Sequence, residues 1–236
     1  MRISIVIPTL NEANYVDVTL FHARRLNPYE IIVADSHSED GTVKIARKYG
    51  AKVVYAKRGT ASYGRNAGAK AAKGDVILFL DADSIVFPNL LEVLKKDFSN
   101  EKVVGWTCLI HGFTPSWRQI SIYNLSNDIC EFLTNHLKTP HSPGVVIAVR
   151  RKAFESAGGF DERLRVMEDH DFTMRVGRLG HFKFSKETCV YTSTRRISKF
   201  GAPDFIKKFS KVYLHYVLDK RALRKNMHKI KYEPIR

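Results

Sequence analysis

Short, wholly apolar runs alternate with amphipathic stretches through the first third of the chain, and no other feature constrains the fold as much. Strands that are apolar on both faces are typical of a parallel sheet with helices on both sides. The runs are ISIVIP, EIIVAD, AKVVYA and DVILFLD, at 3–8, 30–35, 51–56 and 75–81. The amphipathic stretches between them lie at 14–26, 42–49 and 62–72. The sequence therefore predicts an α/β fold with a mostly parallel, Rossmann-like sheet flanked by helices.

The remainder of the chain continues this pattern with longer elements. We expect a helix that starts at Pro88, because proline is favoured in the first turn. The other expected elements are strands at 102–110 and 144–150 and helices at 116–137, 152–156 and from 168 to 180. With 236 residues and 44% hydrophobic side chains, the chain is long enough to bury one substantial core.

Positive charge is concentrated at the C-terminal end. The formal net charge is +15, and the segment from Arg195 to Arg236 carries thirteen Lys or Arg residues but three Asp or Glu residues. Gly201-Ala202-Pro203 is the expected boundary. We therefore predict a domain at 1–200 and a basic, amphipathic helical extension at 201–236. Such a helix either packs one face on the domain or lies on an anionic bilayer, and the sequence leaves both open.

The three cysteines have no metal-binding or disulfide spacing, and the sequence shows no secretory or spanning segment. An odd number of cysteines without a C-x-x-C pair indicates neither a disulfide framework nor a zinc site. The N-terminus lacks the cleavage pattern of a signal peptide. No window reaches the roughly 18 apolar residues that a spanning helix needs. We expect a cytoplasmic protein that is soluble or peripheral at the inner face of the membrane.

Polar side chains follow several of the predicted strands. Ligands of an open α/β sheet bind at the carboxyl ends of its strands. Asp81 and Asp83 follow the fourth strand, and their two like charges favour a cation between them. A hard divalent ion needs few protein carboxylates when phosphates and waters complete its shell. The alternative is that these residues form a cap and turn before the helix at Pro88.

Further polar residues are expected at the same edge. Thr9 and Glu12 follow the first strand, and Asp35 ends the second. Arg65 lies near the start of the helix at 62–72, within a glycine-containing stretch that lacks the G-x-G-x-x-G spacing. A guanidinium there would suit a phosphate or a base. The alternative is a helix with small residues that serve packing, and the two interpretations are compatible.

Five motifs, in order, carry a resemblance to a known family. They are SIVIPTLNE (4–12), IIVADSHSEDGT (31–42), GRNAGAKAAKGDVILFLDADS (64–84), GGFDE (158–162) and EDHDF (168–172). In this order and with these predicted elements, the chain resembles the family two glycosyltransferases, which have the GT-A fold, use nucleotide sugars and are usually inverting. The resemblance extends to about residue 196.

The resemblance implies roles for individual residues. Pro8, Thr9, Glu12 and Asp35 are expected to form the pocket for the base and ribose, with Arg65 beside them. Asp81 would lie against the ribose or sugar. Asp83 would ligate Mn²⁺ or Mg²⁺, and Asp169 would be the general base, with Glu168 next to it. The resemblance therefore predicts that these residues lie together in one site.

Three further features bear on these assignments: a departure from the family pattern, two additional candidate residues and an alternative interpretation. His37 departs from the family pattern after the second strand, and Arg195 and Arg196 resemble arginines that some members place near the diphosphate. Taken alone, EDHD is more typical of helix capping than of a catalytic base.

The resemblance implies an inverting, metal-assisted transfer of a sugar from a UDP- or GDP-linked donor. The acceptor would be a glycan hydroxyl or a lipid-linked phosphate, with peripheral membrane contact through the basic helix. An alternative is a nucleic-acid-binding protein that uses the basic extension, but clustered carboxylates repel phosphates, and no nucleic acid is expected. Another alternative is a nucleotidyltransferase, which shares acidic metal ligands on an α/β sheet.

Overall fold

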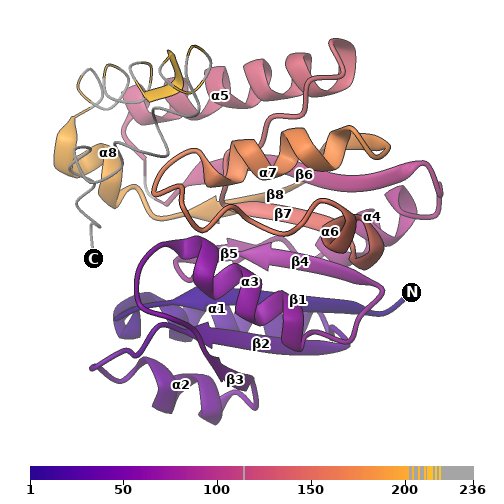
Figure 1. Ribbon diagram of the computed structural model, residues 1–236. Coiled ribbons are helices and arrows are strands. Elements are labelled where there is room, and N and C mark those ends of the chain that lie inside the picture. Colours follow the sequence, from indigo (N-terminus) through magenta and orange to yellow (C-terminus); the bar gives the residue numbers. More distant parts are fainter. Residues whose placement is uncertain are drawn as a thin grey trace.

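The computed structural model describes residues 1–113 and 115–201, together with residues 204, 207, 210, 212–214, 216 and 218, except for the side chains of residues 196 and 200. Within this part, strands and helices form one mixed sheet with helices on both faces (Figure 1).

The first part of the chain alternates strictly between strand and helix. Its elements are β1 (Ile3–Thr9), α1 (Ala13–Arg25), β2 (Glu30–Asp35), α2 (Thr42–Lys48), β3 (Lys52–Tyr55), α3 (Ala61–Ala71), β4 (Val76–Leu80), β5 (Ser84–Val86) and α4 (Leu90–Asp97). Each apolar run of the sequence becomes one strand. The strands and helices predicted up to residue 81 are confirmed.

The second part contains longer strands and the polar loops between them. Its elements are β6 (Val103–Gly112), α5 (Trp117–Glu131), a π-helical turn η1 (Phe132–His136), β7 (Val146–Arg150), α6 (Arg151–Ser156), α7 (Glu168–Gly177), β8 (His181–Thr192) and α8 (Arg195–Phe200). A reciprocal capping box between Ser116 and Gln119 starts α5.

The eight strands pair in the order β3-β2-β1-β4-β7-β6-β8-β5. The strands β3, β2, β1 and β4 are parallel, whereas β7 is antiparallel to both of its neighbours. In this register Thr9 lies beside Asp35. The carboxyl ends of β1, β2 and β4 therefore meet at one edge, where parallel sheets bind their ligands.

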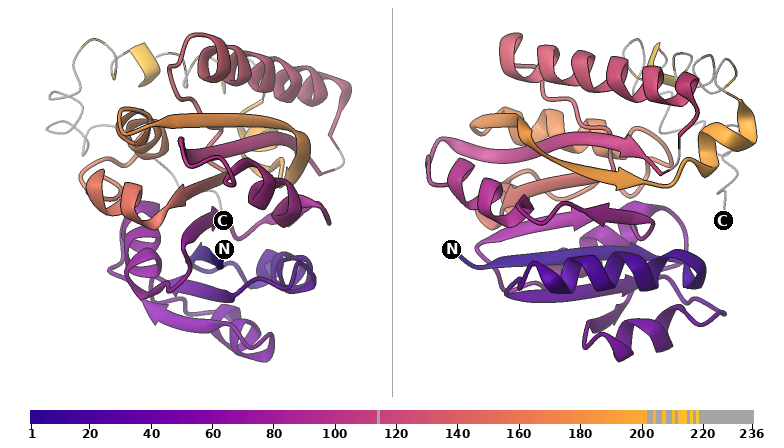
Figure 2. Two further views of the ribbon diagram at one scale, coloured as in Figure 1. Left: turned by 90° about the vertical axis from the view of Figure 1, so that its right-hand side faces the viewer. Right: turned by 180° about the vertical axis from the view of Figure 1, so that it is seen from behind.

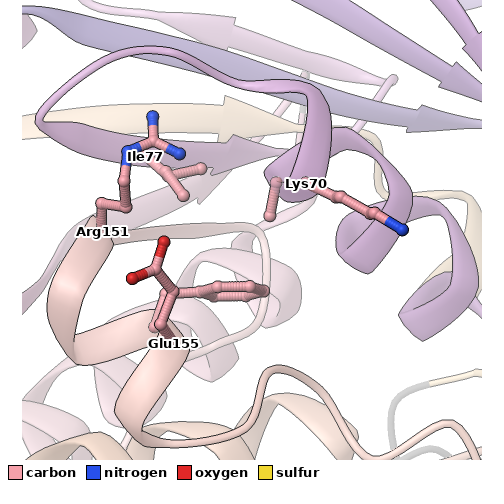
Figure 3. Close-up of a pocket in the computed structure, with 6 residues that line it drawn as sticks. Lys70, Ile77, Arg151 and Glu155 are labelled. Carbon is pink, nitrogen blue, oxygen red and sulfur yellow. The ribbon is translucent and has the colours of Figure 1, made fainter.

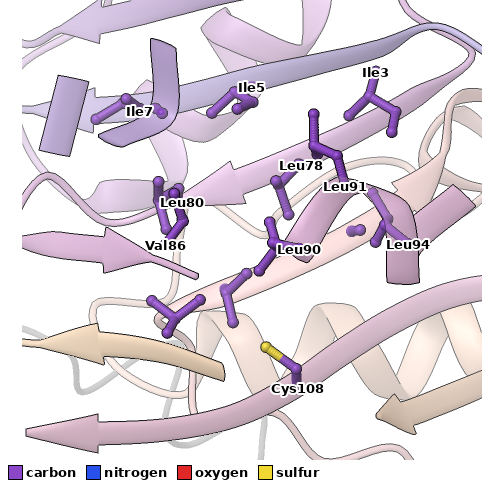
Figure 4. Close-up of a cluster of buried hydrophobic side chains, with 14 of the residues drawn as sticks. Ile3, Ile5, Ile7, Leu78, Leu80, Val86, Leu90, Leu91, Leu94 and Cys108 are labelled. Carbon is purple, nitrogen blue, oxygen red and sulfur yellow. The ribbon is translucent and has the colours of Figure 1, made fainter. Parts of the chain in front are cut away.

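Each face of the sheet has its own core because its strands are apolar on both sides. Odd-numbered residues of β1 and even-numbered residues of β4 face α1 and α4, and their neighbours face α3, α6 and α7. Figure 4 shows the first core, with Ile3, Ile5, Ile7, Leu78, Leu80, Leu90 and Leu94. Figure 1 has α3, α6 and α7 in front of the sheet, and the right panel of Figure 2 shows α1 from behind. The edge at the carboxyl ends of β1, β2 and β4, which carries Glu12, Asp35, Asp81 and Asp83, is called the acidic edge below, and the sheet behind it has helices on both faces.

The local structure differs from the sequence prediction in detail. The helix expected at Pro88 begins at Leu90 with Asn89 as its N-cap, so Asp81 and Asp83 do not cap it. Residues Ala82 and Asp83 do form a turn between β4 and β5, as the alternative to a metal site had it. The sequence prediction also omits β5, β8 and α8. Of these, β8 matters most because it delivers Arg195 to the site.

Most of the basic extension predicted at 201–236 lies outside the described residues, and the domain boundary stays a prediction. Those residues between 204 and 218 that are described have helical backbone. Two of them contact the domain. Tyr213 Oη lies 3.1 Å from His141 Nε2, and Tyr216 Oη donates to Asp171 at 3.0 Å. Within the described part, no helix is both long and apolar enough to cross a membrane.

Candidate active site

Arg65 connects two groups of carboxylates at the edge of the sheet. Its side chain projects from α3, and its Nη2 donates to Asp81 Oδ1 at 3.0 Å, just after β4. Its Nη1 donates to Glu168 Oε1 at 3.1 Å, in the first turn of α7. The Gly144 carbonyl accepts from the same guanidinium at 3.3 Å. Residues far apart in sequence are thus held around one buried cation.

The GGFDE motif explains how Arg65 is held. The Arg65 guanidinium lies 5.3 Å above the Phe160 ring, which stacks on Phe172 of α7. Asn66 exchanges two hydrogen bonds with the Phe160 backbone, each of 2.9 Å. Gly159 has a φ of +68°, and a Cβ there would come within 2.8 Å of Asn66 Oδ1. The motif therefore places an aromatic ring against the arginine side chain.

Asp169 lies in the first turn of α7, beside Glu168. Met167, with a left-handed backbone, precedes the helix and gives no side-chain cap. The His170 backbone N–H donates to Asp169 Oδ1 at 2.7 Å, so part of the capping alternative is present. The other oxygen, Oδ2, faces Gly144, where an added Cβ would lie only 2.0 Å away. The loop at Gly144 therefore needs a glycine to make room for this carboxylate.

Burial raises the pKa of both acids, and a neighbouring carboxylate adds to the rise, Asp169 for Glu168 and Asp81 for Asp169. Burial raises the pKa of Glu168 to about 7, assisted by the charge of Asp169 and opposed by Arg65. Burial also raises the pKa of Asp169, whereas Arg65 and the His170 N–H lower it. For Arg65, burial lowers the pKa, but Asp81, Glu168 and Asp169 raise it by more. Groups whose pKa values are shifted by burial and by charged neighbours are concentrated at functional sites, so these acids are candidates for a catalytic role.

A second arginine, Arg195, joins Glu12 to Asp83. Its Nη1 and Nη2 donate to both oxygens of Glu12 at 3.0 and 2.9 Å. The same Nη2 lies 3.1 Å from Asp83 Oδ2. All three side chains are largely buried, with exposed fractions of 15%, 13% and 11%. Asp81 and Asp83 therefore face different arginines, although one alanine separates them.

Thr19 of α1 fixes the turn that carries Asp83. Its hydroxyl donates to the Ala82 carbonyl at 2.7 Å and accepts from the Ser84 N–H at 3.0 Å. The Ser193 N–H donates to the Asp83 carbonyl at 3.2 Å, which ties the chain before α8 to this turn. The turn is thus held from two sides, and Asp83 has a defined position.

The carboxylate oxygens of Glu12 and Asp83 are ligands of the kind that a hard divalent cation binds. One nitrogen of Arg195 contacts oxygens of both Glu12 and Asp83, so the two carboxylates already share a positive charge. Among the described residues, no group of three or more His, Cys, Asp or Glu side chains could hold a metal ion alone. A site with one or two carboxylates is complete only when a substrate supplies further oxygens, as Mg²⁺ sites with phosphates do.

Asp35 organises the loop after β2. It is fully buried and accepts hydrogen bonds from Thr9 Oγ1 at 2.9 Å and from the Ser38 N–H and hydroxyl at 2.8 and 2.5 Å. His37 stacks on Tyr55 beside it, with ring centroids 5.4 Å apart. Pro8 is covered by α3 at Gly64, where a Cβ would come within 2.9 Å. These residues lie together at the ends of β1, β2 and β3.

The predicted site residues therefore fall into three connected groups. Arg65 and Asp81 lie together with Asp169, Glu12 lies with Asp83, and Thr9 and Pro8 lie with Asp35. Their roles stay predictions. Glu168, Gly144 and Asn66 were given no role from sequence. Arg195 was singled out by the resemblance, but the strand before it was missed, although the alternation of aromatic and polar residues in 181–192 is typical of a strand.

A separate cavity of about 240 Å³ lies between α3, β4 and α6. Figure 3 shows Lys70, Ile77, Arg151 and Glu155 around it. Ile77 is near the start of β4, whereas Asp81 follows its end. None of the predicted site residues lines this cavity, so the acidic edge and the cavity are different places.

Comparison with known proteins agrees with the fold. The sheet and its helices are of the GT-A type. The model of the family described as Glycosyl transferase family 2 matches residues 4–158. Because this match covers more than half of the sequence, the chain belongs to glycosyl transferase family 2.

An uncharacterized glycosyltransferase of Rickettsia prowazekii (strain Madrid E) is 26% identical over 212 residues, which cover 80% of this chain and 62% of that protein. The chain thus spans less than two thirds of that relative's length.

Two solved structures show the same fold. Staphylococcus aureus TarS 1–349, in complex with UDP-GlcNAc, has a TM-score of 0.68 at 22% identity, covering 83% of this chain and 59% of that one. The mannosyltransferase PcManGT from Pyrobaculum calidifontis, in complex with GDP-Man and Mn²⁺, has a TM-score of 0.66 at 18% identity, covering 82% and 57%.

Proposed function

We propose that this chain is a metal-assisted, inverting glycosyltransferase that moves a sugar from a nucleoside diphosphate to an acceptor. One observation carries the proposal. The turn after β4 places Asp81 against Arg65, which also binds Glu168 beside Asp169, and places Asp83 in the cluster of Glu12 and Arg195. This turn therefore connects two buried ion-pair clusters, one with Asp83, which would hold the metal, and one with Asp81 and Arg65 beside the proposed base.

Asp169 has the chemistry of a general base. Inversion requires that the acceptor hydroxyl attack the anomeric carbon from the side opposite the leaving diphosphate, and a base must remove its proton. Burial raises the pKa of Asp169 toward the range in which such a base is efficient, while Arg65 and the helix N-terminus favour its ionised form. Glu168, with a pKa of about 7, would hold a proton near it.

Asp83, with Glu12 beside it, would hold Mn²⁺ or Mg²⁺. When bound, such an ion neutralises charge that develops on the leaving diphosphate. Asp81 would accept a hydrogen bond from the ribose or sugar. Thr9, Pro8 and Asp35 would line the base and ribose pocket, with Arg65 bordering it. PcManGT, a structural neighbour of this chain, was solved with a nucleotide sugar and Mn²⁺, which supports this assignment.

The proposed acceptor is a glycan hydroxyl or a lipid-linked phosphate. Exposed apolar side chains on α5, including Trp117, Leu125 and Ile129, would support contact with a bilayer together with the basic C-terminal residues. A cytoplasmic location at the inner membrane face stays a prediction. Nothing in the described residues favours nucleic-acid binding or nucleotidyl transfer over glycosyl transfer.

The test is thermal unfolding in the presence of UDP- and GDP-linked sugars, with and without Mn²⁺. Binding to the native state at 100 times Kd contributes about 2.7 kcal/mol, so the matching donor should raise Tm by roughly 5 to 10 °C. Chelation of Mn²⁺ and the Asp83→Asn substitution should each remove most of this shift. A protein whose Tm responds to no nucleotide sugar, or responds equally without metal, would contradict the proposal.

A further inference from the structure

Arg195 is bound to the same carboxylate that the proposed function assigns to the metal. Its guanidinium makes a two-pronged pair with Glu12, and its Nη2 also contacts Asp83 at 3.1 Å. Bidentate pairs of this kind are the strong form of the arginine–carboxylate interaction. The cluster is thus neutralised in part by a side chain of the protein itself.

The surroundings make Arg195 a well-held cation with unused donor capacity. Burial lowers the pKa of Arg195, but hydrogen bonds to Glu12 and the charges of Asp83 and Glu12 raise it by more. The guanidinium also lies 4.8 Å above the Tyr15 ring. Its buried Nε has no hydrogen-bond acceptor among the described residues. A buried donor without a partner is costly, so an incoming acceptor would be favoured there.

A divalent ion and this guanidinium compete for Asp83. Two cations that share one carboxylate oxygen in a poorly solvated site repel each other strongly. The backbone next to Arg195 is fixed to the turn, because the Ser193 N–H donates to the Asp83 carbonyl. A metal that takes the Asp83 oxygen contacted by Arg195 would displace the side chain, while its attachment point stays beside the site.

We propose that Arg195 is an exchangeable positioning residue, which holds Asp83 and Glu12 together in the donor-free protein and moves to the diphosphate when metal and nucleotide bind. This inference rests on the proposed function. The planar guanidinium suits both partners, since it pairs with carboxylate and phosphate in the same two-pronged geometry. Because Arg195 competes with the metal for Asp83, the metal binds weakly until a diphosphate offers the arginine another partner. Metal and nucleotide are therefore expected to bind together.

The inference predicts opposite effects of one substitution on two affinities. Arg195→Met removes the competing cation, so Mn²⁺ alone should bind about tenfold more tightly in an electron paramagnetic resonance titration. With Mn²⁺ saturating, UDP and GDP should bind about tenfold more weakly in calorimetry, because the diphosphate loses its arginine. A residue that only supported the fold would weaken both.

Arg65→Met is the matched control, because it removes an arginine that is also buried but is paired with Asp81. It should leave the affinity for Mn²⁺ alone within about twofold of the unsubstituted protein. If Arg195→Met does not fold by circular dichroism, Arg195→Lys replaces it. Lysine cannot form the two-pronged pair, so Mn²⁺ alone should still bind more tightly, by a smaller factor.

The outcomes separate this inference from the proposed function. Unchanged or weaker binding of Mn²⁺ alone in the Arg195 variant, or equal tightening in Arg65→Met, would overturn the inference and leave the proposed function standing. If the unsubstituted protein binds neither Mn²⁺ with nucleotide nor any nucleotide sugar, the proposed function fails, and the inference fails with it.

Discussion

At the scale of single residues, Arg65 sets the electrostatics of the proposed base. It is 4% exposed and contacts both Asp81 and Glu168. Ion pairs as buried as these rarely add much stability over apolar packing, because both partners lose their hydration. Their cost is better explained by function. The arginine lowers the pKa of two acids whose pKa values burial raises.

Replacement of Arg65 should change the pH dependence of the reaction. Arg65 lowers the pKa of Asp169 and Glu168, so Arg65→Met should raise both. Asp169 acts as a base only when ionised. The acid limb of the kcat/KM profile should therefore move to higher pH.

Arg151→Met, which removes a guanidinium that donates to the Gly74 carbonyl, serves as the control and should leave the limb in place. A limb that stays in place in Arg65→Met, or moves to lower pH, would show that Arg65 does not control the base.

The residue scale is also where sequence was least informative. The sequence identifies Asp81, Asp83 and Asp169 as candidate site residues. It does not identify their arginine partners, because these contacts join residues that are far apart in the sequence. Arg65 meets Glu168 only because Phe160 and Phe172 stack beneath it. No periodicity in the sequence encodes such a contact. A family resemblance supplied the candidate residues, and the structure supplied their pairing.

At the scale of elements, the loop before β7 and the start of α7 act as a unit. Gly144 has a φ of +82° and faces the Asp169 carboxylate, while its carbonyl accepts from Arg65. His141 in the same loop contacts His170 of α7, with ring centroids 4.4 Å apart. The geometry of the proposed base therefore depends on this loop.

Two glycine variants separate backbone strain from this steric requirement. Gly144 and Gly158 both have positive φ, at +82° and +75°, but a Cβ at Gly158 would meet nothing within 4 Å. Alanine at either position should cost about 1 to 2 kcal/mol of folding free energy. Gly144→Ala should also lower kcat at least about tenfold, because misplacement of a catalytic group by about 1 Å has large effects.

Urea unfolding and steady-state turnover measure the two effects in the same samples. Equal turnover in the two variants, once both are folded, would mean that Gly144 does not position Asp169.

The elements themselves were largely predictable. Apolar runs bounded by polar loops predicted β1 to β4, because wholly apolar strands leave few alternatives in a chain of this composition. The turn at Ala82 and the strands β5 and β8 were not found. β5 is only three residues long, and exposed Lys186 and Glu187 interrupt the apolar alternation of β8. Short or interrupted strands depend on their sheet neighbours more than on local sequence.

At the scale of the whole molecule, the parallel half and the mixed half meet at the acidic edge. β1, β2 and β4 bring the residues proposed for the donor, and β7, α7 and β8 bring Gly144, Asp169 and Arg195. Tyr213 and Tyr216 contact His141 and Asp171 from the C-terminal side. Tyr213 and Tyr216 therefore lie next to the loop and the helix that carry Gly144 and Asp169.

The most direct test of the account is a crystal structure of the chain with Mn²⁺ and the nucleotide sugar that gives the largest Tm shift. The account predicts the ion about 2.1 Å from a carboxylate oxygen of Asp83, as expected for a small divalent cation. Arg195 should then contact the diphosphate, and Asp169 should face the anomeric carbon from the opposite side. A diphosphate bound away from Asp83, or a sugar that Asp169 does not face, would contradict the account.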